Sequence, residues 1–173
     1  MNQQEPTQAQ FHARKAVDVV LCGVLTISDS RTASNDVSGD CVSELLKSQG
    51  HEIVVRELLP DDRHQVADWI THQCASGNLD TVLTTGGTGL TSRDQTVEAV
   101  EHLFERRIPG FGELFRMLSF DDIGPAAMLS RATAGTIGRT LVFCMPGSPD
   151  AVELAVRRLI APTLPHIGWL LRR

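Results

Sequence analysis

The chain has 173 residues, 42% of them hydrophobic and 21% charged, which is the size and composition of one globular domain rather than of a disordered or collagen-like chain. Its formal net charge of −5 and its lack of a long basic run argue against nucleic acid as a partner, because such binding needs clustered lysine and arginine. No apolar stretch approaches the roughly 20 residues that cross a bilayer, and residues 1–15 lack the apolar core of a signal peptide, so we expect no membrane partner and a cytoplasmic protein.

The cysteines and histidines do not form a recognisable metal-binding pattern. Cys22, Cys41, Cys74 and Cys144 are widely spaced and include no C-x-x-C pair, and a cytosolic protein would keep them reduced. We interpret them as small apolar residues. The six histidines show no H-x-x-x-H or H-E-x-x-H spacing, so a histidine-ligated metal is not expected.

The first half of the chain alternates apolar runs with amphipathic segments. Apolar and β-branched runs predict strands, and apolar residues at helical spacing predict helices between them. The strands are expected at residues 16–27, 52–59 and 81–85, and the helices at 41–49 and 66–77. Strands that alternate with helices in this way predict parallel pairing with right-handed crossovers, and therefore an α/β protein.

The second half is less regular. We expect a flexible N-terminus over residues 1–15 and a single domain over 16–173, in which the 108–125 region is an excursion with a short helix rather than a new domain. The helices are expected at about 95–106 and from Pro149 onward, and the strands at 129–137 and 140–145 around a turn at Gly138. Residues 163–173 are assigned no element.

Four loops follow the ends of predicted strands. They contain Ser28 and Asp29, Pro60 and Asp61, Thr85 to Gly89, and Pro146, Gly147 and Ser148. In open α/β sheets, ligands bind in the crevice outside the carboxyl ends of the strands. The order of elements therefore predicts that these loops form one binding site.

The most informative loop is T-T-G-G-T-G at residues 84–89. Closely spaced glycines let the backbone approach an anion and direct N–H groups toward it, so Thr85, Gly86, Gly87, Thr88 and Gly89 are candidate phosphate ligands. The loop is neither a Walker A motif nor the G-x-G-x-x-G of dinucleotide-binding domains. The alternative is a flexible turn without a ligand. Gly147 and Ser148 offer a second, weaker anion site of the same kind.

Two aspartates accompany this loop. Asp94 follows it, and a carboxylate beside a phosphate site suits a divalent cation, although Asp94 could equally be the N-cap of the next helix. Asp61 lies on the second loop, where the alternative is a simple turn and helix start. Together the two carboxylates favour Mg²⁺-dependent phosphoryl or nucleotidyl transfer, because Mg²⁺ binds one or two carboxylates plus substrate phosphates.

Several segments in the same order resemble one known family. They are L-T-I-S-D-S-R from Leu25, L-T-T-G-G-T-G-L-T-S-R-D from Leu83, I-P-G-F-G-E-L-F-R-M-L-S-F-D-D-I-G from Ile108, L-S-R-A-T-A-G from Leu129 and M-P-G-S-P from Met145. This pattern resembles the molybdopterin-binding MoaB/MogA family over most of the chain. The R-M-L-S-F and S-R-A-x-A-G runs are more similar to the MoaB branch.

The resemblance implies a three-layer α/β/α domain with a mostly parallel sheet, and a role in molybdenum cofactor biosynthesis. Active members adenylylate molybdopterin with Mg-ATP and release pyrophosphate. Carried over to this sequence, the catalytic and Mg²⁺-binding aspartates are Asp61 and Asp94. The residues expected to bind substrate or phosphate are Ser28, Asp29, Thr85, Gly86, Gly87, Thr88, Gly89, Ser119, Ser130, Pro146, Gly147 and Ser148.

Two other functions stay open at this point. The chain could carry molybdopterin without turning over ATP, or could act as a scaffold for other proteins of the pathway. The resemblance also implies a trimer or hexamer. Apolar residues in the 108–123 region and at 167–171 are numerous enough to form a subunit interface, the alternative being extra core.

Overall fold

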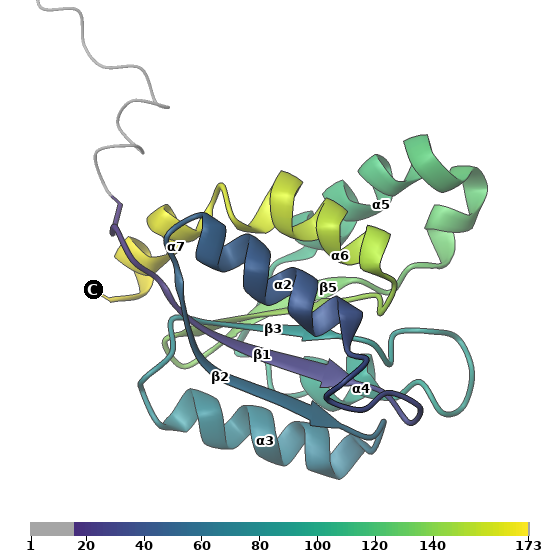
Figure 1. The fold of residues 1–173 in the computed structure, drawn as a ribbon, viewed down its shortest axis with the longest axis horizontal. Coiled ribbons are helices and arrows are strands. Elements are labelled where there is room, and N and C mark those ends of the chain that lie inside the picture. The colour runs from purple at the N-terminus through teal and green to yellow at the C-terminus, as the bar shows by residue number, and fades with distance from the viewer. Residues whose placement is uncertain (1–15, 173) are drawn as a thin grey trace, which may run out of the picture.

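A six-stranded sheet organises residues 16–172, the part of the chain that the computed structural model describes (Figure 1). The strands are β1 (Leu21–Ile27), β2 (Glu52–Leu59), β3 (Thr81–Thr85), β4 (Arg106–Arg107), β5 (Thr133–Ile137) and β6 (Thr140–Met145), in the order β2-β1-β3-β6-β5-β4. The pairs β1–β2, β1–β3 and β3–β6 are parallel, and β5 is antiparallel to both β6 and β4. The flexible segment predicted at 1–15 lies outside the described residues.

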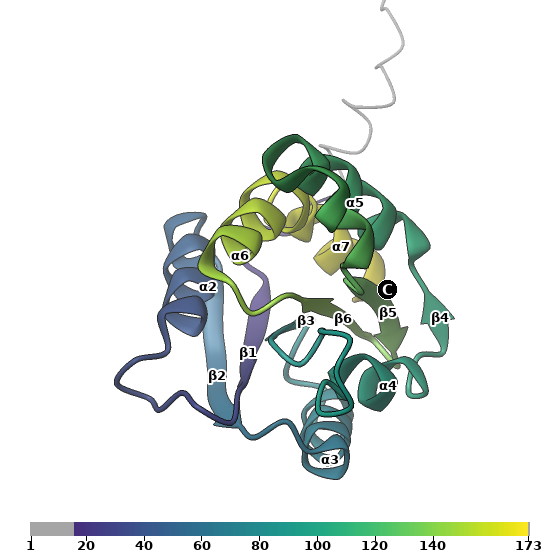
Figure 2. The ribbon, with the colours of Figure 1, turned by 90° about the vertical axis from the view of Figure 1, so that its right-hand side faces the viewer.

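Helices cover both faces of this sheet (Figure 2). On one face lie α2 (Val37–Ser48), α5 (Pro109–Ile123), α6 (Pro149–Ala155) and α7 (Leu164–Leu171), with a 3-10 helix, η1 (Gly124–Leu129), and a π-helical turn, η2 (Val156–Ile160). On the other face lie α3 (Arg63–Ala75) and α4 (Thr96–Glu101). The expected three-layer α/β/α architecture is confirmed. Within residues 16–172, no helix is long and apolar enough to cross a membrane.

The strand sequences account for this arrangement. All residues of the central strands β3 and β6 are buried, as expected for parallel strands covered on both faces. The edge strand β2 instead alternates between half-buried and exposed residues over its first half. Two separate apolar cores result, one on each face of the sheet.

The strand predicted at 140–145 and the helix predicted from Pro149 are confirmed, whereas three other sequence-based bounds were wrong. The first strand begins at Leu21 instead of residue 16. The helix predicted at 95–106 ends at Glu101, because Phe104 packs over Gly135 and the chain then joins the sheet as β4. The strand predicted from residue 129 begins at Thr133, after η1.

The 108–125 region is not an excursion with a short helix. It forms α5, a helix of 15 residues, and one side of α5 belongs to the larger core. Phe111 and Phe115 are buried there, and the ring centroids of Phe111 and Phe143 are 5.0 Å apart in an edge-on arrangement. Because these aromatic side chains are buried, α5 is an integral part of the helical layer on this face of the sheet.

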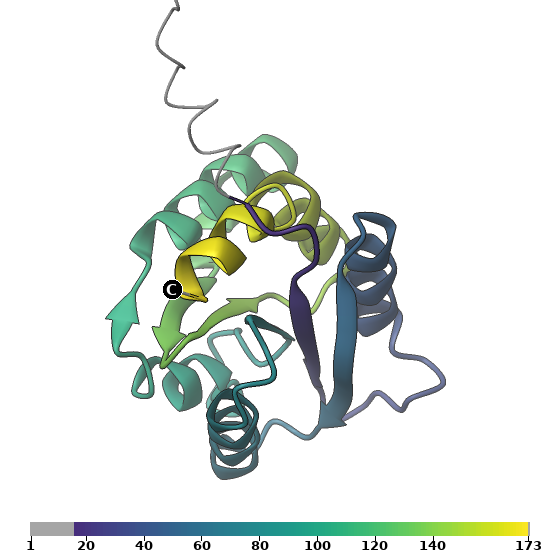
Figure 3. The same cartoon turned by 90° about the vertical axis from the view of Figure 1, so that its left-hand side faces the viewer.

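The unassigned C-terminal segment forms α7, at the amino ends of the strands (Figure 3). Arg172 pairs there with Asp80, whose carboxylate also accepts a hydrogen bond from the N–H of Leu21 at 2.7 Å. Burial opposes the ionisation of Asp80, but the guanidinium of Arg172 and the N–H of Leu21 together lower its pKa. This ion pair lies at the amino ends of the strands, opposite the predicted site.

The interpretation of the cysteines as apolar residues fits the structure. Cys22 and Cys144 are fully buried in the two cores, Cys41 and Cys74 are half-buried, and all four thiols are free. Burial raises the pKa of both Cys22 and Cys144 to about 12, so neither is a thiolate at neutral pH.

Candidate functional site

The four predicted loops meet at the carboxyl edge of the sheet, which faces the viewer in Figure 2. The N–H of Ser28 donates to the carbonyl of Leu59 at 2.9 Å, which joins the loops after β1 and β2. The hydroxyl of Thr85 donates to the carbonyl of Pro146 at 3.1 Å, which joins the loops after β3 and β6. The convergence expected from the order of elements is confirmed.

The glycines of residues 86–89 are required by local geometry. Gly86 and Gly87 have φ angles of 105° and 63°, in the region that side chains disfavour. A Cβ atom on Gly87 would lie 1.9 Å from the Thr96 hydroxyl and 2.6 Å from Asp61 Oδ2. The loop therefore passes so close to Asp61 that only glycine fits.

Substituting Gly87 by alanine should test this closeness. We expect Gly87→Ala to cost at least about 1 kcal/mol more than Gly77→Ala, because overpacking adds to the backbone strain. Gly77 is a matched control, since its φ is 69° but a Cβ there meets nothing within 4 Å. Chemical denaturation of both variants measures the difference, and equal losses would contradict the close approach.

The loop offers backbone N–H groups to an anion. Among the described residues, the N–H groups of Gly87 and Thr88 have no hydrogen-bond partner, whereas that of Gly86 donates to the carbonyl of Met145. The predicted role of Gly86 as an N–H donor therefore does not fit, because its N–H joins two loops instead. The helix that follows, α4, has only six residues, so its dipole adds less than a long helix would.

Asp61 faces this loop from the end of β2. It is not the cap of α3, since Asp62 accepts the capping hydrogen bonds. The backbone N–H of Asp61 donates to Asp29 Oδ1 at 3.0 Å, and its own Oδ1 accepts from the N–H of Gln95 at 3.3 Å. Burial, together with the negative charges of Asp94 and Asp29, raises the pKa of Asp61. A cation would relieve this concentration of negative charge.

Asp94 is not the N-cap of α4. The capping position is Gln95, which makes no side-chain capping bond, and Asp94 instead closes a turn by accepting hydrogen bonds from the N–H and hydroxyl of Thr91 at 2.9 and 2.5 Å. The hydroxyl of Thr91 contributes most to lowering the pKa of Asp94. A Cβ atom on Gly89 would lie 2.6 Å from Asp94 Oδ2. Both carboxylates thus border the glycine loop.

The donor set at this edge fits Mg²⁺ bound together with a phosphate ligand. Within residues 16–172, no group of three or more His, Cys, Asp or Glu side chains could enclose a metal by itself. Mg²⁺ is typically held by one or two carboxylates plus substrate phosphates, and Asp61 and Asp94 supply two carboxylates beside unpaired N–H groups. A metal here would depend on a phosphate-bearing substrate.

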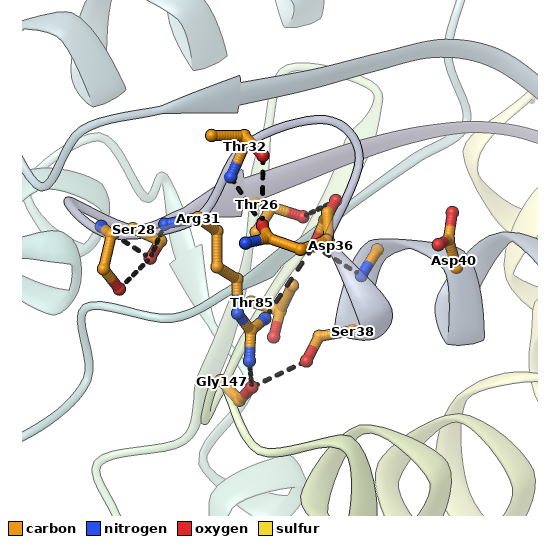
Figure 4. A network of polar contacts seen from close by, with 12 residues as sticks. Thr26, Ser28, Arg31, Thr32, Asp36, Ser38, Asp40, Thr85 and Gly147 are labelled. Carbon is orange, nitrogen blue, oxygen red and sulfur yellow. Dashed lines mark hydrogen bonds and ion pairs between the residues drawn. The ribbon is translucent and has the colours of Figure 1, made fainter.

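A buried polar network around Asp36 supports the neighbouring loops and was missed by the sequence analysis (Figure 4). Asp36 is 1% exposed, caps α2 through the N–H of Gly39, and accepts hydrogen bonds from Thr26 and Arg56 at 2.8 and 2.7 Å. Burial opposes its ionisation, but Arg56, Gly39 and Thr26 together lower the pKa of Asp36. The network joins β1, α2 and β2.

Two further residues connect this network to the loop after β6. Arg31 Nη2 and the hydroxyl of Ser38 both donate to the carbonyl of Gly147, at 3.0 and 2.7 Å (Figure 4). A Cβ atom on Gly147 would lie 3.2 Å from the Cα of Gly86. Gly147 is thus held against the glycine loop by one side chain from the loop after β1 and one from α2.

The serines predicted to bind substrate or phosphate mostly hydrogen-bond to the protein backbone or line neighbouring hollows. Ser28 accepts hydrogen bonds from the N–H groups of Ser30 and Arg31, and Ser148 caps α6. Ser119 donates to the carbonyl of Phe115 and lines a hollow of about 380 Å³ together with Ser148. Ser130 lines a different hollow of about 470 Å³ beside α5. The structure brings Ser119 near the last loop, and it places Ser130 directly before Arg131, whose side chain donates to the carbonyls of Thr88 and Asp94.

Known proteins share both the sequence pattern and the fold. Residues 23–166 match the model of a family described as "Probable molybdopterin binding domain". Molybdenum cofactor biosynthesis protein B of Bacillus cereus is 49% identical over 163 residues, which are 94% of this chain and 96% of that relative.

The solved structures agree with this match. A crystal structure of molybdenum cofactor biosynthesis protein B has a TM-score of 0.85 and 50% identity, covering 89% of this chain and 96% of that one. A structure of MogA has a TM-score of 0.73 and 27% identity, covering 85% of this chain and 99% of that one. The greater likeness to the MoaB type agrees with the branch expected from the sequence.

Proposed function

Because this chain belongs to the molybdopterin-binding domain family that includes the MoaB and MogA proteins, we propose that it adenylylates molybdopterin with Mg-ATP during molybdenum cofactor biosynthesis. In this reaction an oxygen of the terminal phosphate of molybdopterin attacks the α-phosphorus of ATP. The bond between the α- and β-phosphates breaks, and pyrophosphate leaves. The products are adenylyl-molybdopterin and pyrophosphate.

The observation that carries this proposal is the pair of carboxylates around the glycine loop. Asp61 and Asp94 come from different loops, border Gly87 and Gly89, and lie beside the unpaired N–H groups of Gly87 and Thr88. Such a pair has little use in a passive pterin carrier, which needs to bind phosphate but has no need of a metal. The arrangement favours nucleotidyl transfer over binding alone.

The protein contributes position and charge rather than covalent chemistry. The N–H groups of Gly87 and Thr88 bind phosphate oxygens, and Asp61 and Asp94 hold Mg²⁺, which when bound neutralises the phosphates of ATP. Asp29 keeps the backbone of Asp61 in place, and Gly147 lies against the glycine loop. Holding the terminal phosphate of molybdopterin in line with the α-phosphate of ATP removes much of the entropic barrier to transfer.

Pyrophosphate release tests this function against its alternatives. We expect release that requires both molybdopterin and Mg²⁺. A protein that retains molybdopterin but releases no pyrophosphate would be a carrier, and a protein that binds no molybdopterin would be left with a scaffold role.

We also propose that the chain forms a homo-oligomer, a trimer or hexamer, through α5 and η1. Six large apolar side chains there are between 46% and 76% exposed: Leu114, Met117, Phe120, Ile123, Met128 and Leu129. Residues 167–171 were also named from the sequence as a candidate interface. Among the large apolar side chains of that segment, only Leu170 is exposed. Exposed apolar area of this extent is typical of subunit contacts.

Charged substitutions on α5 should dissociate the oligomer. We expect the double variant Met117→Glu, Phe120→Glu to become monomeric, because it places two carboxylates in a desolvated contact. Leu170→Glu is the control, since Leu170 is exposed to a similar extent, at 50%, but lies on α7. Light scattering coupled to size exclusion measures the mass. An unchanged mass of the α5 variant would place the contact elsewhere.

A further inference from the structure

Arg131 connects both ends of the loop that carries Asp94. It lies between η1 and β5, and its side chain is 25% exposed. Its Nε donates to the carbonyl of Thr88 at 3.1 Å, and its Nη2 donates to the carbonyl of Asp94 at 2.8 Å. Its Nη1 pairs with Glu98 of α4. All three guanidinium nitrogens are therefore engaged.

The loop between Thr88 and Asp94 has few other attachments to the domain. Leu90 is 66% exposed, so it provides no apolar anchor, and residues 91–93 are exposed as well. The hydrogen bonds from Thr91 to Asp94 lie within the loop and would move with it. The base of the loop is held by the N–H of Thr96, which donates to the carbonyl of Gly87 at 3.1 Å. Within residues 16–172, Arg131 alone hydrogen-bonds this loop to the segment between η1 and β5.

We infer that Arg131 is a positioning residue, which fixes the carboxylate of Asp94 relative to Asp61 and thereby sets the Mg²⁺ affinity of the site. A guanidinium suits this task because its donors form a rigid planar fork that reaches two carbonyls and a carboxylate at once. The effect of Arg131 on the Mg²⁺ dependence of transfer rests on the proposed adenylylation, whereas its effect on the position of the loop does not. Arg131 itself touches neither substrate nor metal in this account.

Limited proteolysis tests the mechanical part without any activity assay. Arg93 is exposed within the loop, but trypsin can cut the chain after it only when the loop opens locally. We expect cleavage after Arg93 to be faster by roughly tenfold or more in Arg131→Ala, since charge-assisted hydrogen bonds are lost. Arg116→Ala is the matched control, because Arg116 lines the same hollow but donates to the carbonyl of Ser130 instead. Cleavage of Arg131→Ala at the wild-type rate would overturn the inference.

The Mg²⁺ dependence of transfer tests the catalytic part. We expect Arg131→Ala to need several-fold more Mg²⁺ for half-maximal rate while its rate at saturating Mg²⁺ stays close to that of the wild type. Arg131→Lys keeps the charge but has one donor nitrogen instead of three, so it should fall between the two, and it replaces the alanine variant if that variant unfolds. A lower maximal rate with unchanged Mg²⁺ dependence would contradict a role through Asp94. If the wild type transfers no adenylyl group, the proposed function fails while proteolysis still decides what Arg131 does.

Discussion

Replacing Asp61 by asparagine is expected to lower the rate of adenylyl transfer by about 100-fold or more, as for the loss of one preorganised charge-stabilising group. The variant should be at least as stable as the wild type. Asparagine keeps an oxygen that accepts from the N–H of Gln95, so the loop geometry is retained. Steady-state kinetics and thermal unfolding measure the two effects.

The stability effect follows from the pKa of Asp61. Burial and its acidic neighbours raise this pKa above the ordinary value of 3.8, so the folded state favours the protonated form more than the unfolded state does. The ionised side chain therefore costs stability at pH values above the raised pKa, and this cost disappears below about 3.8. Asp61→Asn should exceed the wild type in stability near pH 7 and match it in acid. A variant that loses stability near pH 7 but keeps its activity would assign Asp61 a structural role.

Replacing Asp36 by alanine is expected to destabilise the domain by about 3 kcal/mol, which combines a lost N-cap with a lost charged acceptor. Asp36 is buried and accepts from Arg56, Thr26 and Gly39, so several donors lose their partner together. Chemical denaturation measures the loss. Acid should remove the same contribution from the wild type, because the pKa of Asp36 is lowered and its stabilisation is lost as the pH falls through that lowered value.

Asp40 provides the control for this substitution. It also pairs with Arg56, at 2.5 Å, but its side chain is 56% exposed. An exposed ion pair contributes about 1 kcal/mol or less, so Asp40→Ala should be nearly neutral. Equal losses in both variants would mean that the pairing with Arg56, rather than the buried cap and its hydrogen bonds, accounts for the effect.

The parallel part of the fold was predictable from local sequence. The predicted strands at 52–59, 81–85 and 140–145 coincide with β2, β3 and β6, because runs of apolar and β-branched residues and the loops after them carry their own signal. The antiparallel edge was not predictable in the same way. The helix α4 ends early because Phe104 packs over Gly135, which is 31 positions away in the sequence and becomes its neighbour only in the fold.

The candidate site shows the same division. The glycine loop and the aspartates at 61 and 94 were identified from sequence, because strand order brings the loops together. The residues that support them were missed, since Asp36 meets Arg56 across 20 positions and Arg131 meets Thr88 across 43. For Asp36 a local signal existed, an aspartate directly before the V-S-G-D start of α2, which is a typical N-cap pattern. Arg131 lies within the S-R-A-x-A-G run that carried the family resemblance, but nothing in its local sequence indicated a role in the site.

The most direct test of the proposed activity is the fate of the α-phosphate of ATP. Protein, molybdopterin, Mg²⁺ and ATP labelled at the α-phosphate are incubated, and the pterin product is separated and counted. We predict label on molybdopterin in a one-to-one ratio with released pyrophosphate, dependent on Mg²⁺ and nearly absent with Asp61→Asn. Molybdopterin that stays bound to the protein and unlabelled would contradict the account and identify a carrier.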